Sequence, residues 1–228
     1  MKPSNELLPE PWPAEPMSTI AAWLTEATER RHQPNPNAMV LATATRDCRP
    51  SARVVLCKSV VVEPGYLVFY THYESRKGQE LKENQHAAAV IHWDHLHRQI
   101  RVEGVVAPSP ADESDAYFAS RPWQSRVGAW ASAQSQPIGS REALLSAVAK
   151  TARRFGVPNP GDETARETDI AIPRPPHWGG YRLWADAVEL WVEGKARVHD
   201  RVRWTRSLSE RSADEFAAGP WTATRLQP

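Results

Sequence analysis

The stretch RPSARVVLCKSVVVEPGYLVFYTHYESRKG, residues 49–78, decides the fold that we predict for this chain. Val and Leu dominate the run over 51–62, a Glu-Pro-Gly turn follows at 63–65, and a second apolar run covers 66–71. Two β-rich runs separated by a Pro-Gly turn predict a hairpin. A polar, helix-like stretch begins after 75–78.

Cationic side chains lie near the ends of this predicted hairpin: Arg53, Lys58, Arg76 and Lys77. With neighbouring hydroxyl groups they suit a phosphorylated ligand, because guanidinium and ammonium groups donate charge-assisted hydrogen bonds to its oxygens. A solvated basic edge strand gives the same pattern, since Lys and Arg protect sheet edges. The pattern alone leaves both interpretations open.

Length and composition predict a single-domain, soluble protein of the reduced cytoplasm. The chain has 228 residues and a net charge of +1, which gives no argument for nucleic acid or an anionic membrane as partner. No apolar run reaches the roughly 20 residues that a membrane span needs. Cys48 and Cys57 show neither metal-ligand spacing nor a disulfide framework, and we expect no metal site. We expect a flexible arm over 1–15 and one domain over 16–228.

The remaining periodic segments predict helices and further strands. Apolar spacing predicts a helix over 17–31, with Ser18 as its N-cap. Another helix is predicted over 140–155, with four residues facing inward: Leu144, Leu145, Val148 and Ala152. Further segments are predicted as strands (38–45, 87–93, 99–107, 181–184, 187–192, 221–226), as a helix (108–120), as a polar loop (207–219) and as a long Pro-rich loop (156–177).

Two further groups of polar residues are candidates for ligand binding. Tyr117 and Arg121 are one helical turn apart, and with Ser125 they suit a second phosphate, although a capped helix end with a surface Arg is the commoner origin of such a pattern. Strand alternation over 197–205 places Arg197, His199 and Arg201 on one face. A solvent-facing strand would look the same. Gln99 lies at the start of its strand, where its amide could contact a ligand, but the pattern alone favours an ordinary exposed strand terminus.

Taken together, these stretches resemble the pyridoxamine 5′-phosphate oxidase family. The resemblance is carried, in family order over about 35–228, by PNAMVLATA, PSARVVLCK, FYTHYESRKG, RQIRVEGVV, YFASRP, GAWASAQS, WGGYR, VELW, RVHDR and RLQP. It implies a mainly β fold with peripheral helices (α+β), the FMN-binding split β-barrel. It also implies a homodimer whose C-terminal segment, about 178–228, serves dimerisation and substrate binding.

The activity implied by the resemblance is oxidation of pyridoxamine or pyridoxine 5′-phosphate to pyridoxal 5′-phosphate, with FMN as cofactor, O2 as acceptor and H2O2 as by-product. The implied FMN-binding residues are Arg53, Val54, Val55, Leu56, Cys57, Lys58, Tyr70, Thr71, Arg76, Lys77, Gln99, Gln134, Ser135, Trp191 and Arg201. The implied substrate-binding residues are Lys58, Tyr117, Arg121, Ser125, Arg197 and His199, of which Arg197 and His199 are the catalytic pair.

Some features depart from the family pattern, and other functions compete. Arg53 and Lys58 are an odd number of residues apart, so both can serve one ligand only if the strand bulges or contacts use the backbone. Trp123 stands where many relatives carry a basic or polar residue. The alternatives are an oxidase of another reduced aromatic substrate, such as a phenazine precursor, a non-catalytic flavin-binding protein, and a β-barrel interaction protein.

Overall fold

The computed structural model describes residues 7–162 and 170–228. The chain divides into two compact units. Unit 1 comprises Met1–Phe69, Glu80–Ala107 and Tyr181–Pro228, and unit 2 comprises Tyr70–Gln79 and Pro108–Gly180. Among the described residues, no helix combines the length and the apolar character that crossing a membrane requires.

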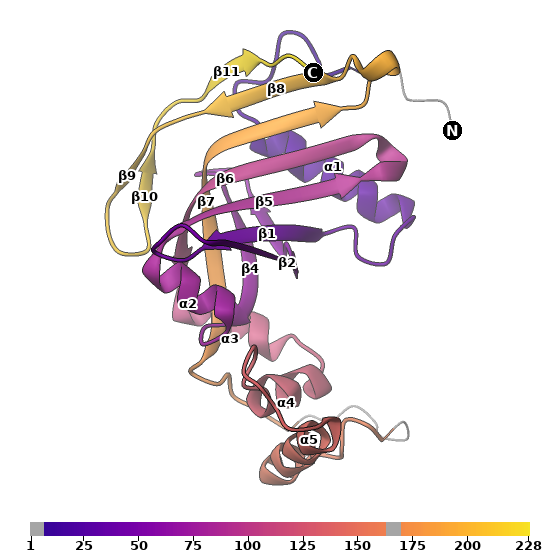
Figure 1. The fold of residues 1–228 in the computed structure, drawn as a ribbon, viewed down its shortest axis with the longest axis vertical. Helices are drawn as coiled ribbons and strands as arrows, with labels where there is room; N and C mark the ends of the chain where they lie inside the picture. Colours follow the sequence, from indigo (N-terminus) through magenta and orange to yellow (C-terminus); the bar gives the residue numbers. More distant parts are fainter. Residues whose placement is uncertain (1–6, 163–169) are drawn as a thin grey trace. The chain divides into compact units, whose positions relative to one another are not determined.

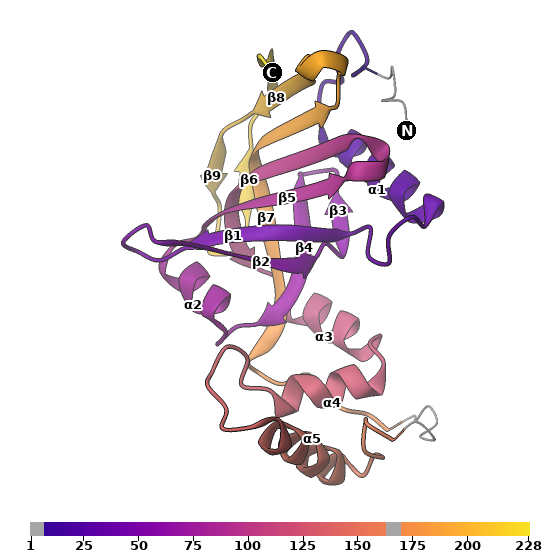
Figure 2. The ribbon, with the colours of Figure 1, turned by 45° about the vertical axis from the view of Figure 1, so that its right-hand side comes forward.

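Unit 1 is built on an antiparallel sheet that curls into a half-barrel (Figures 1 and 2). The nine-stranded sheet follows the order β11-β8-β7-β6-β5-β1-β2, while β4 pairs with β3 and β7. Its strands are β1 (Ala38–Ala44), β2 (Pro50–Leu56), β3 (Ser59–Val61), β4 (Tyr66–His72), β5 (His86–Trp93), β6 (Arg98–Pro108), β7 (Trp178–Val192), β8 (Asp200–Thr205) and β11 (Thr222–Arg225). The predicted mainly β fold with peripheral helices is confirmed.

The predicted hairpin across the Pro-Gly turn is present, but the run before it is two strands. β3 pairs with β4, with Val61 opposite Tyr66, whereas β2 pairs with β1. The chain changes partner at Cys57, whose N–H donates to the Asn37 carbonyl (2.9 Å), and at Lys58, whose N–H donates to the Val68 carbonyl (2.7 Å). This break takes the place of the bulge considered from the sequence.

Helix α1 (Met17–Arg30) confirms the predicted spacing, since its buried face comprises Met17, Ile20, Trp23 and Ala27. The predicted N-cap was wrong. Ser18 provides no cap, and the Glu15 carboxylate instead accepts hydrogen bonds from the backbone N–H groups of Met17 (2.6 Å) and Ser18 (3.1 Å). A carboxylate suits this position because it pairs with N–H groups that lack helical partners.

Three predictions for the C-terminal part of unit 1 need correction. The predicted strands 181–184 and 187–192 are one continuous strand, β7. The predicted polar loop contains a short hairpin of β9 (Leu208–Glu210) and β10 (Phe216–Ala218). The predicted strand from 197 begins only at 200, because the 3-10 turn η2 (Lys195–Arg197) contains left-handed backbone at Ala196 (φ 54°) and Arg197 (φ 65°).

Unit 2 consists mainly of three helices around an aromatic core. They are α3 (Ala111–Ala119), α4 (Trp123–Ala131) and α5 (Arg141–Phe155). The core combines Phe118, Trp123, Val127, Ala152, Val157, Ile172 and Trp178. Thus Trp123 is a core residue. The sequence analysis did not predict α4, although Pro122 directly precedes it and proline is well tolerated where a helix begins.

Helix α5 matches its prediction in extent but not in its inner face. Ser140 is its N-cap, with the side chain accepting a hydrogen bond from the Ala143 N–H (3.1 Å). Ala152 is buried and Val148 packs against the core as predicted. Leu144 and Leu145 are 37% and 53% exposed, so the prediction that they face inward was wrong. The helix contacts α4 through residues nearer its C-terminus, which leaves these leucines on the outside. Residues 163–169 of the predicted Pro-rich loop lie outside the described part.

Candidate active site

Arg53 and the strand around it form the first group of predicted site residues, in unit 1. The Arg53 guanidinium donates to the Leu41 carbonyl (3.1 Å) and the Thr43 hydroxyl (2.6 Å), and pairs with the Glu80 carboxylate (3.2 Å). The Glu80 side chain is only 4% exposed. A buried carboxylate therefore fixes the orientation of Arg53 and balances its charge. Glu80 was not singled out from the sequence.

The predicted residues that follow Arg53 along the chain differ widely in exposure. Val54 is 65% exposed, Val55 and Leu56 are half-buried, Cys57 is buried and Lys58 is exposed. Burial raises the pKa of the Cys57 thiol to about 12. The thiol therefore stays protonated and offers no thiolate chemistry at neutral pH.

Lys77 organises a second group of predicted residues, in unit 2. Its ammonium donates to the Thr71 hydroxyl (3.0 Å), the Ser75 hydroxyl (3.1 Å) and the Gln134 side-chain oxygen (2.6 Å). Lys77 is 7% exposed. These contacts bring together Thr71, Lys77 and Gln134, whereas Ser135 follows in a left-handed backbone conformation (φ 73°). A largely buried ammonium among hydroxyl groups is suited to an anionic group.

The helix that carries Lys77 also favours an anionic group at its N-terminus. Helix α2 (Arg76–Glu83) begins directly after Ser75, whose hydroxyl accepts a hydrogen bond from the Gly78 N–H (3.4 Å). A side chain at Gly78 would collide with the Tyr73 carbonyl, since its Cβ would stand 1.9 Å from that oxygen. Exposed Arg76 lies in the first turn, where the helix dipole favours negative charge.

Arg121 lies against the aromatic residues of unit 2. The Tyr70 and Tyr117 rings stack at 3.9 Å between centroids, and the Arg121 guanidinium lies 4.7 Å from the Trp178 ring centroid. Its Nη1 is buried and has no hydrogen-bond partner among the described residues. Burial lowers the pKa of Arg121, and Tyr117 counteracts this. Such a half-buried cation with one unpaired, buried nitrogen is suited to an anionic ligand.

Ser125 and Trp178 complete the description of this region. Ser125 lies in the first turn of α4, where its N–H donates to the Pro122 carbonyl (3.0 Å). The sequence analysis missed Trp178 as a neighbour of the predicted Arg121. The WGG motif at 178–180 was a signal, but stacking between segments so distant in sequence is visible only in the structure.

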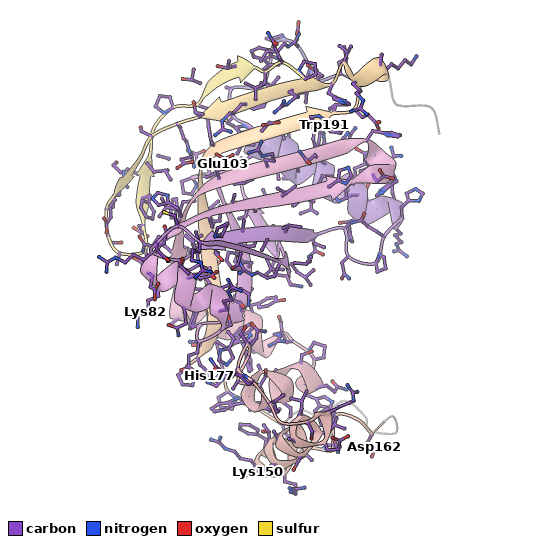
Figure 3. The ribbon with its side chains drawn as sticks, in the orientation of Figure 1. Lys82, Glu103, Lys150, Asp162, His177 and Trp191 are labelled. Atoms are coloured by element: carbon purple, nitrogen blue, oxygen red, sulfur yellow. The ribbon has the colours of Figure 1, made fainter. Side chains whose placement is uncertain are left out.

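The remaining predicted residues lie in unit 1. Trp191 and Arg201 are opposite one another on β7 and β8, and Figure 3 labels Trp191. Arg201 donates to the Glu189 carboxylate (3.0 Å) and the Gln227 carbonyl (2.9 Å). Glu189 is almost fully buried, so Arg201, like Arg53, has an internal counter-charge. Gln99 is half-buried on β6, opposite His92.

His199 and Arg197 do not share a strand face, contrary to the prediction. His199 precedes β8, its ring lies 4.7 Å from that of Trp191, and its Nδ1 accepts a hydrogen bond from the Gly194 N–H (3.2 Å). Arg197 is exposed in the preceding left-handed turn. His199 also lines a cavity of about 650 Å³ with Leu7, Leu8, Glu10, Val198, Asp200, Arg225, Leu226, Gln227 and Pro228.

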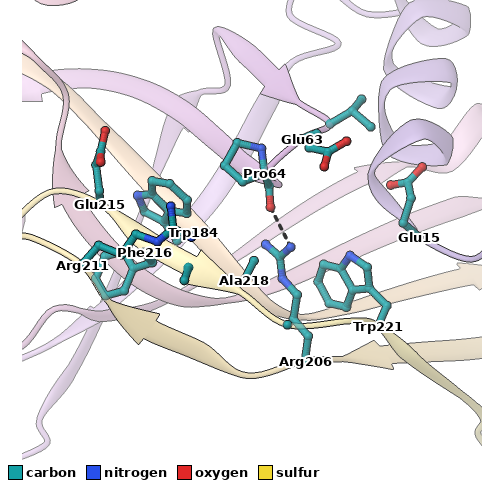
Figure 4. Close-up of a pocket in the computed structure, with 13 residues that line it drawn as sticks. Glu15, Glu63, Pro64, Trp184, Arg206, Arg211, Glu215, Phe216, Ala218 and Trp221 are labelled. Carbon is teal, nitrogen blue, oxygen red and sulfur yellow. Dashed lines mark hydrogen bonds between the residues drawn. The ribbon is translucent and has the colours of Figure 1, made fainter.

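A different cavity of unit 1, of about 480 Å³, contains none of the predicted residues. Arg206 stands in it, 4.2 Å from the Trp221 ring centroid (Figure 4). Its guanidinium donates to the carbonyl oxygens of Pro64 (2.6 Å), Gly65 (2.8 Å) and Ala185 (2.7 Å). Arg206 therefore ties backbone segments together, and we assign it no ligand.

Comparisons with known proteins agree with one family. Residues 24–154 match the family described as pyridoxamine 5′-phosphate oxidase, and residues 178–228 match its pyridoxine 5′-phosphate oxidase C-terminal dimerisation region. A pyridoxine/pyridoxamine 5′-phosphate oxidase of Paraburkholderia phymatum is 46% identical over 93% of this chain and 89% of its own length. The protein of that name from Paracoccus denitrificans is 45% identical over 94% of this chain and 95% of its own length.

A solved structure is similar over the whole chain. The crystal structure of PhzG from Burkholderia lata 383, in complex with tetrahydrophenazine-1-carboxylic acid, is 32% identical with a TM-score of 0.82. The alignment covers 100% of both chains.

Proposed function

We propose a function for this chain from one premise: the chain belongs to the pyridoxamine 5′-phosphate oxidase family. The proposed reaction oxidises pyridoxamine 5′-phosphate or pyridoxine 5′-phosphate to pyridoxal 5′-phosphate. FMN is the proposed cofactor, O2 is the electron acceptor and H2O2 is released. The names of relatives that match nearly the full chain support this proposal.

The observation that carries the substrate proposal is the incompletely paired guanidinium of Arg121. Its buried Nη1 can donate to a phosphate oxygen without first breaking a protein hydrogen bond. The proposed phosphate site combines Arg121 with Tyr117, Ser125 and Lys58. An uncharged substrate gives Arg121 no such partner, so this residue supports an anionic substrate, and a phosphorylated vitamer is the anion that the names of the relatives favour.

The Lys77 group supports a second anionic site, which we propose for the FMN phosphate. Lys77 and the Thr71 and Ser75 hydroxyls that accept from its ammonium already form a compact polar group at the start of α2. The other proposed cofactor residues are Arg53, Val54, Val55, Leu56, Cys57, Lys58, Tyr70, Arg76, Gln99, Gln134, Ser135, Trp191 and Arg201. When bound, FMN accepts a hydride from the 4′ carbon of the substrate and passes the electrons to O2.

We propose that Arg197 and His199 orient the substrate and manage its proton. The Nδ1 of His199 accepts the Gly194 N–H, so in the neutral ring the proton is on Nε2. The ring is also packed against Trp191. A histidine fixed in this way can hold the amine or hydroxyl of the substrate in one orientation and exchange a proton with it.

Likeness to PhzG favours one second candidate, oxidation of a reduced phenazine precursor. That structure contains tetrahydrophenazine-1-carboxylic acid and aligns with this whole chain. A carboxylate could also pair with Arg121, so this residue alone does not separate the two candidates. They share the proposed cofactor and differ in the substrate.

Oxygen uptake by the FMN-loaded protein tests the proposal. The substrates are pyridoxamine 5′-phosphate, pyridoxine 5′-phosphate, unphosphorylated pyridoxine and a reduced phenazine carboxylate. We expect H2O2 formation with both phosphates and at least 100-fold lower kcat/KM with pyridoxine. Turnover of the phenazine substrate alone would favour the second candidate, and FMN binding without any turnover would contradict both.

We also propose that the chain acts as a homodimer, as the match of 178–228 to a dimerisation region supports. Light scattering after gel filtration is expected to give twice the mass of one chain. A monomeric mass at micromolar concentration for the FMN-loaded protein would contradict the proposal.

A further inference from the structure

Two histidines of unit 2 stack on one another, outside the residues assigned to the reaction. His72 ends β4 and His177 precedes β7, and their ring centroids lie 4.3 Å apart. His72 is 4% exposed. The Tyr73 N–H donates to the His177 carbonyl (2.7 Å), so the backbone also holds the two histidines together. Figure 3 labels His177.

Both rings hydrogen-bond to the backbone at the end of α4. His177 Nε2 lies 3.2 Å from the Ala129 carbonyl, to which a proton on that nitrogen is donated. His72 Nδ1 accepts the Glu74 N–H (3.2 Å), so the neutral ring carries its proton on Nε2, and this proton is donated to the Ser132 backbone. The last carbonyl groups of a helix lack helical partners. The two histidines therefore act together as a C-terminal cap of α4.

The segment that follows this cap contains part of the proposed FMN site. Gln134 comes two residues after Ser132, and its side-chain oxygen accepts a hydrogen bond from the Lys77 ammonium (2.6 Å). Ser135 has left-handed backbone (φ 73°), which costs energy at a residue other than glycine and persists only where the surroundings hold it. The place where α4 ends thus decides whether Gln134 reaches Lys77.

His72 also holds the turn that leads to Lys77. Besides the contact of Nδ1 with the Glu74 N–H, the His72 carbonyl accepts a hydrogen bond from the Ser75 hydroxyl (2.6 Å). The same hydroxyl accepts from the Lys77 ammonium (3.1 Å). The neutral ring has one lone pair for this turn and one proton for the end of α4. It therefore links the two segments that surround Lys77.

We propose that His72 and His177 are positioning residues for the proposed FMN phosphate site. The neutral pair holds Gln134 and the turn after β4 around Lys77, and a positive charge on His72 releases both. The two histidines act through these neighbours, and we assign them no contact with the cofactor itself. The inference rests on the proposed function, because it concerns how the FMN site is held in place.

The charges around His72 set the direction of the expected pH effect. Burial lowers the pKa of His72, and so do the charges of His177 and Lys77. Glu74 and the hydrogen bond to Ser132 act in the opposite direction. A histidine whose pKa is lowered by folding contributes its full stabilisation above pH 6.5, and the contribution is lost as the pH falls below that value. A second ring proton would also occupy the Nδ1 that accepts the backbone N–H.

FMN affinity of the FMN-free protein, measured by flavin fluorescence at pH 8 and pH 5.5, tests the proposal. His72→Asn keeps an oxygen that can accept the Glu74 N–H and cannot become charged, whereas His72→Phe keeps a ring and loses the acceptor. The matched control is His95→Phe in unit 1, because burial lowers the pKa of His95 as well and its ring lies 4.8 Å from that of His32.

We compare the ratio of the Kd at pH 5.5 to the Kd at pH 8, since titration of the FMN phosphate itself affects every variant equally. The ratio should be at least threefold larger in the wild type and in His95→Phe than in His72→Asn. At pH 8, His72→Asn should bind FMN within threefold of the wild type, and His72→Phe at least tenfold more weakly. Circular dichroism verifies folding of each variant at both pH values.

Hydrogen exchange in the FMN-free protein gives a readout that needs no cofactor. At pH 8 the amides of 132–136 should exchange at least fivefold faster in His177→Phe, which cannot donate to Ala129, than in the wild type. Equal exchange in the two proteins, or equal Kd ratios in the wild type and His72→Asn, would overturn the positioning role alone. A wild type that binds no FMN at either pH would contradict the proposed cofactor and this inference with it.

Discussion

Replacement of Arg121 by methionine should separate ligand binding from folding. The guanidinium is half-buried, lies over the Trp178 and Phe118 rings at 4.7 and 5.6 Å, and leaves Nη1 without a partner. Each ring contact contributes about 0.5–2 kcal/mol, and desolvation of the cation opposes this by a similar amount. Methionine keeps the apolar contacts. We therefore expect the free energy of unfolding to change by less than about 1 kcal/mol.

Substrate binding should change much more. A hydrogen bond between the guanidinium and a phosphate oxygen contributes about 1.5–3 kcal/mol. Its loss should raise KM for pyridoxine 5′-phosphate roughly 10- to 150-fold. Initial rates of oxygen uptake give KM, and urea unfolding of the same preparations gives stability.

Arg154→Met provides a matched control. The Arg154 guanidinium lies over the Trp130 and Phe155 rings at 4.7 and 5.3 Å, nearly the same arrangement, but outside the proposed site. Its KM should equal that of the wild type. The reasoning is refuted if Arg121→Met changes KM less than threefold, or if its main effect is a loss of more than about 2 kcal/mol of stability.

Three more predictions concern the cofactor, the catalytic pair and acid stability. Lys77→Met should weaken FMN binding at least tenfold by fluorescence titration, with exposed Lys150→Met as control. Arg197→Ala should lower kcat/KM at least tenfold and leave FMN affinity within threefold, and equal losses would refute its assignment. Hydrogen bonding to Arg203 lowers the pKa of Glu103 below 4.5, so this pair stabilises the fold above that pH and the contribution is lost on acidification. Glu103→Gln should cost about 0.5–1 kcal/mol at pH 7 and nothing at pH 2 in urea unfolding, so an equal loss at both would refute the ion-pair origin.

Local turn chemistry made the central hairpin predictable, while long-range pairing did not. Pro-Gly at 64–65 specifies a turn whatever surrounds it. The strand break at Cys57 and Lys58 depends on the carbonyl groups of Asn37, just before β1, and of Val68, in β4. Likewise, Arg197 was placed on a strand because alternation cannot reveal left-handed backbone at residues other than glycine.

Recognition of the candidate site relied on family resemblance more than on spacing. Gln134 is 57 residues from Lys77, and no periodicity indicates that their side chains meet. The counter-charges Glu80 and Glu189 were not predicted, since a buried carboxylate and a surface one look alike in sequence. The spacing of Tyr117 and Arg121 was informative, although Arg121 lies just beyond the end of its helix.

Burial of Cys57 bears on how the chain would tolerate the H2O2 that the proposed reaction releases. Peroxide converts thiolates, not thiols, to sulfenic acids. With a pKa of about 12 and 1% exposure, Cys57 resists that damage even though it lies in the segment proposed to line the flavin. Cys48 is exposed and is the thiol that diffusing oxidant would reach. Repeated turnover in the proposed reaction should therefore oxidise Cys48 before Cys57. Iodoacetamide should label the native chain at Cys48 alone.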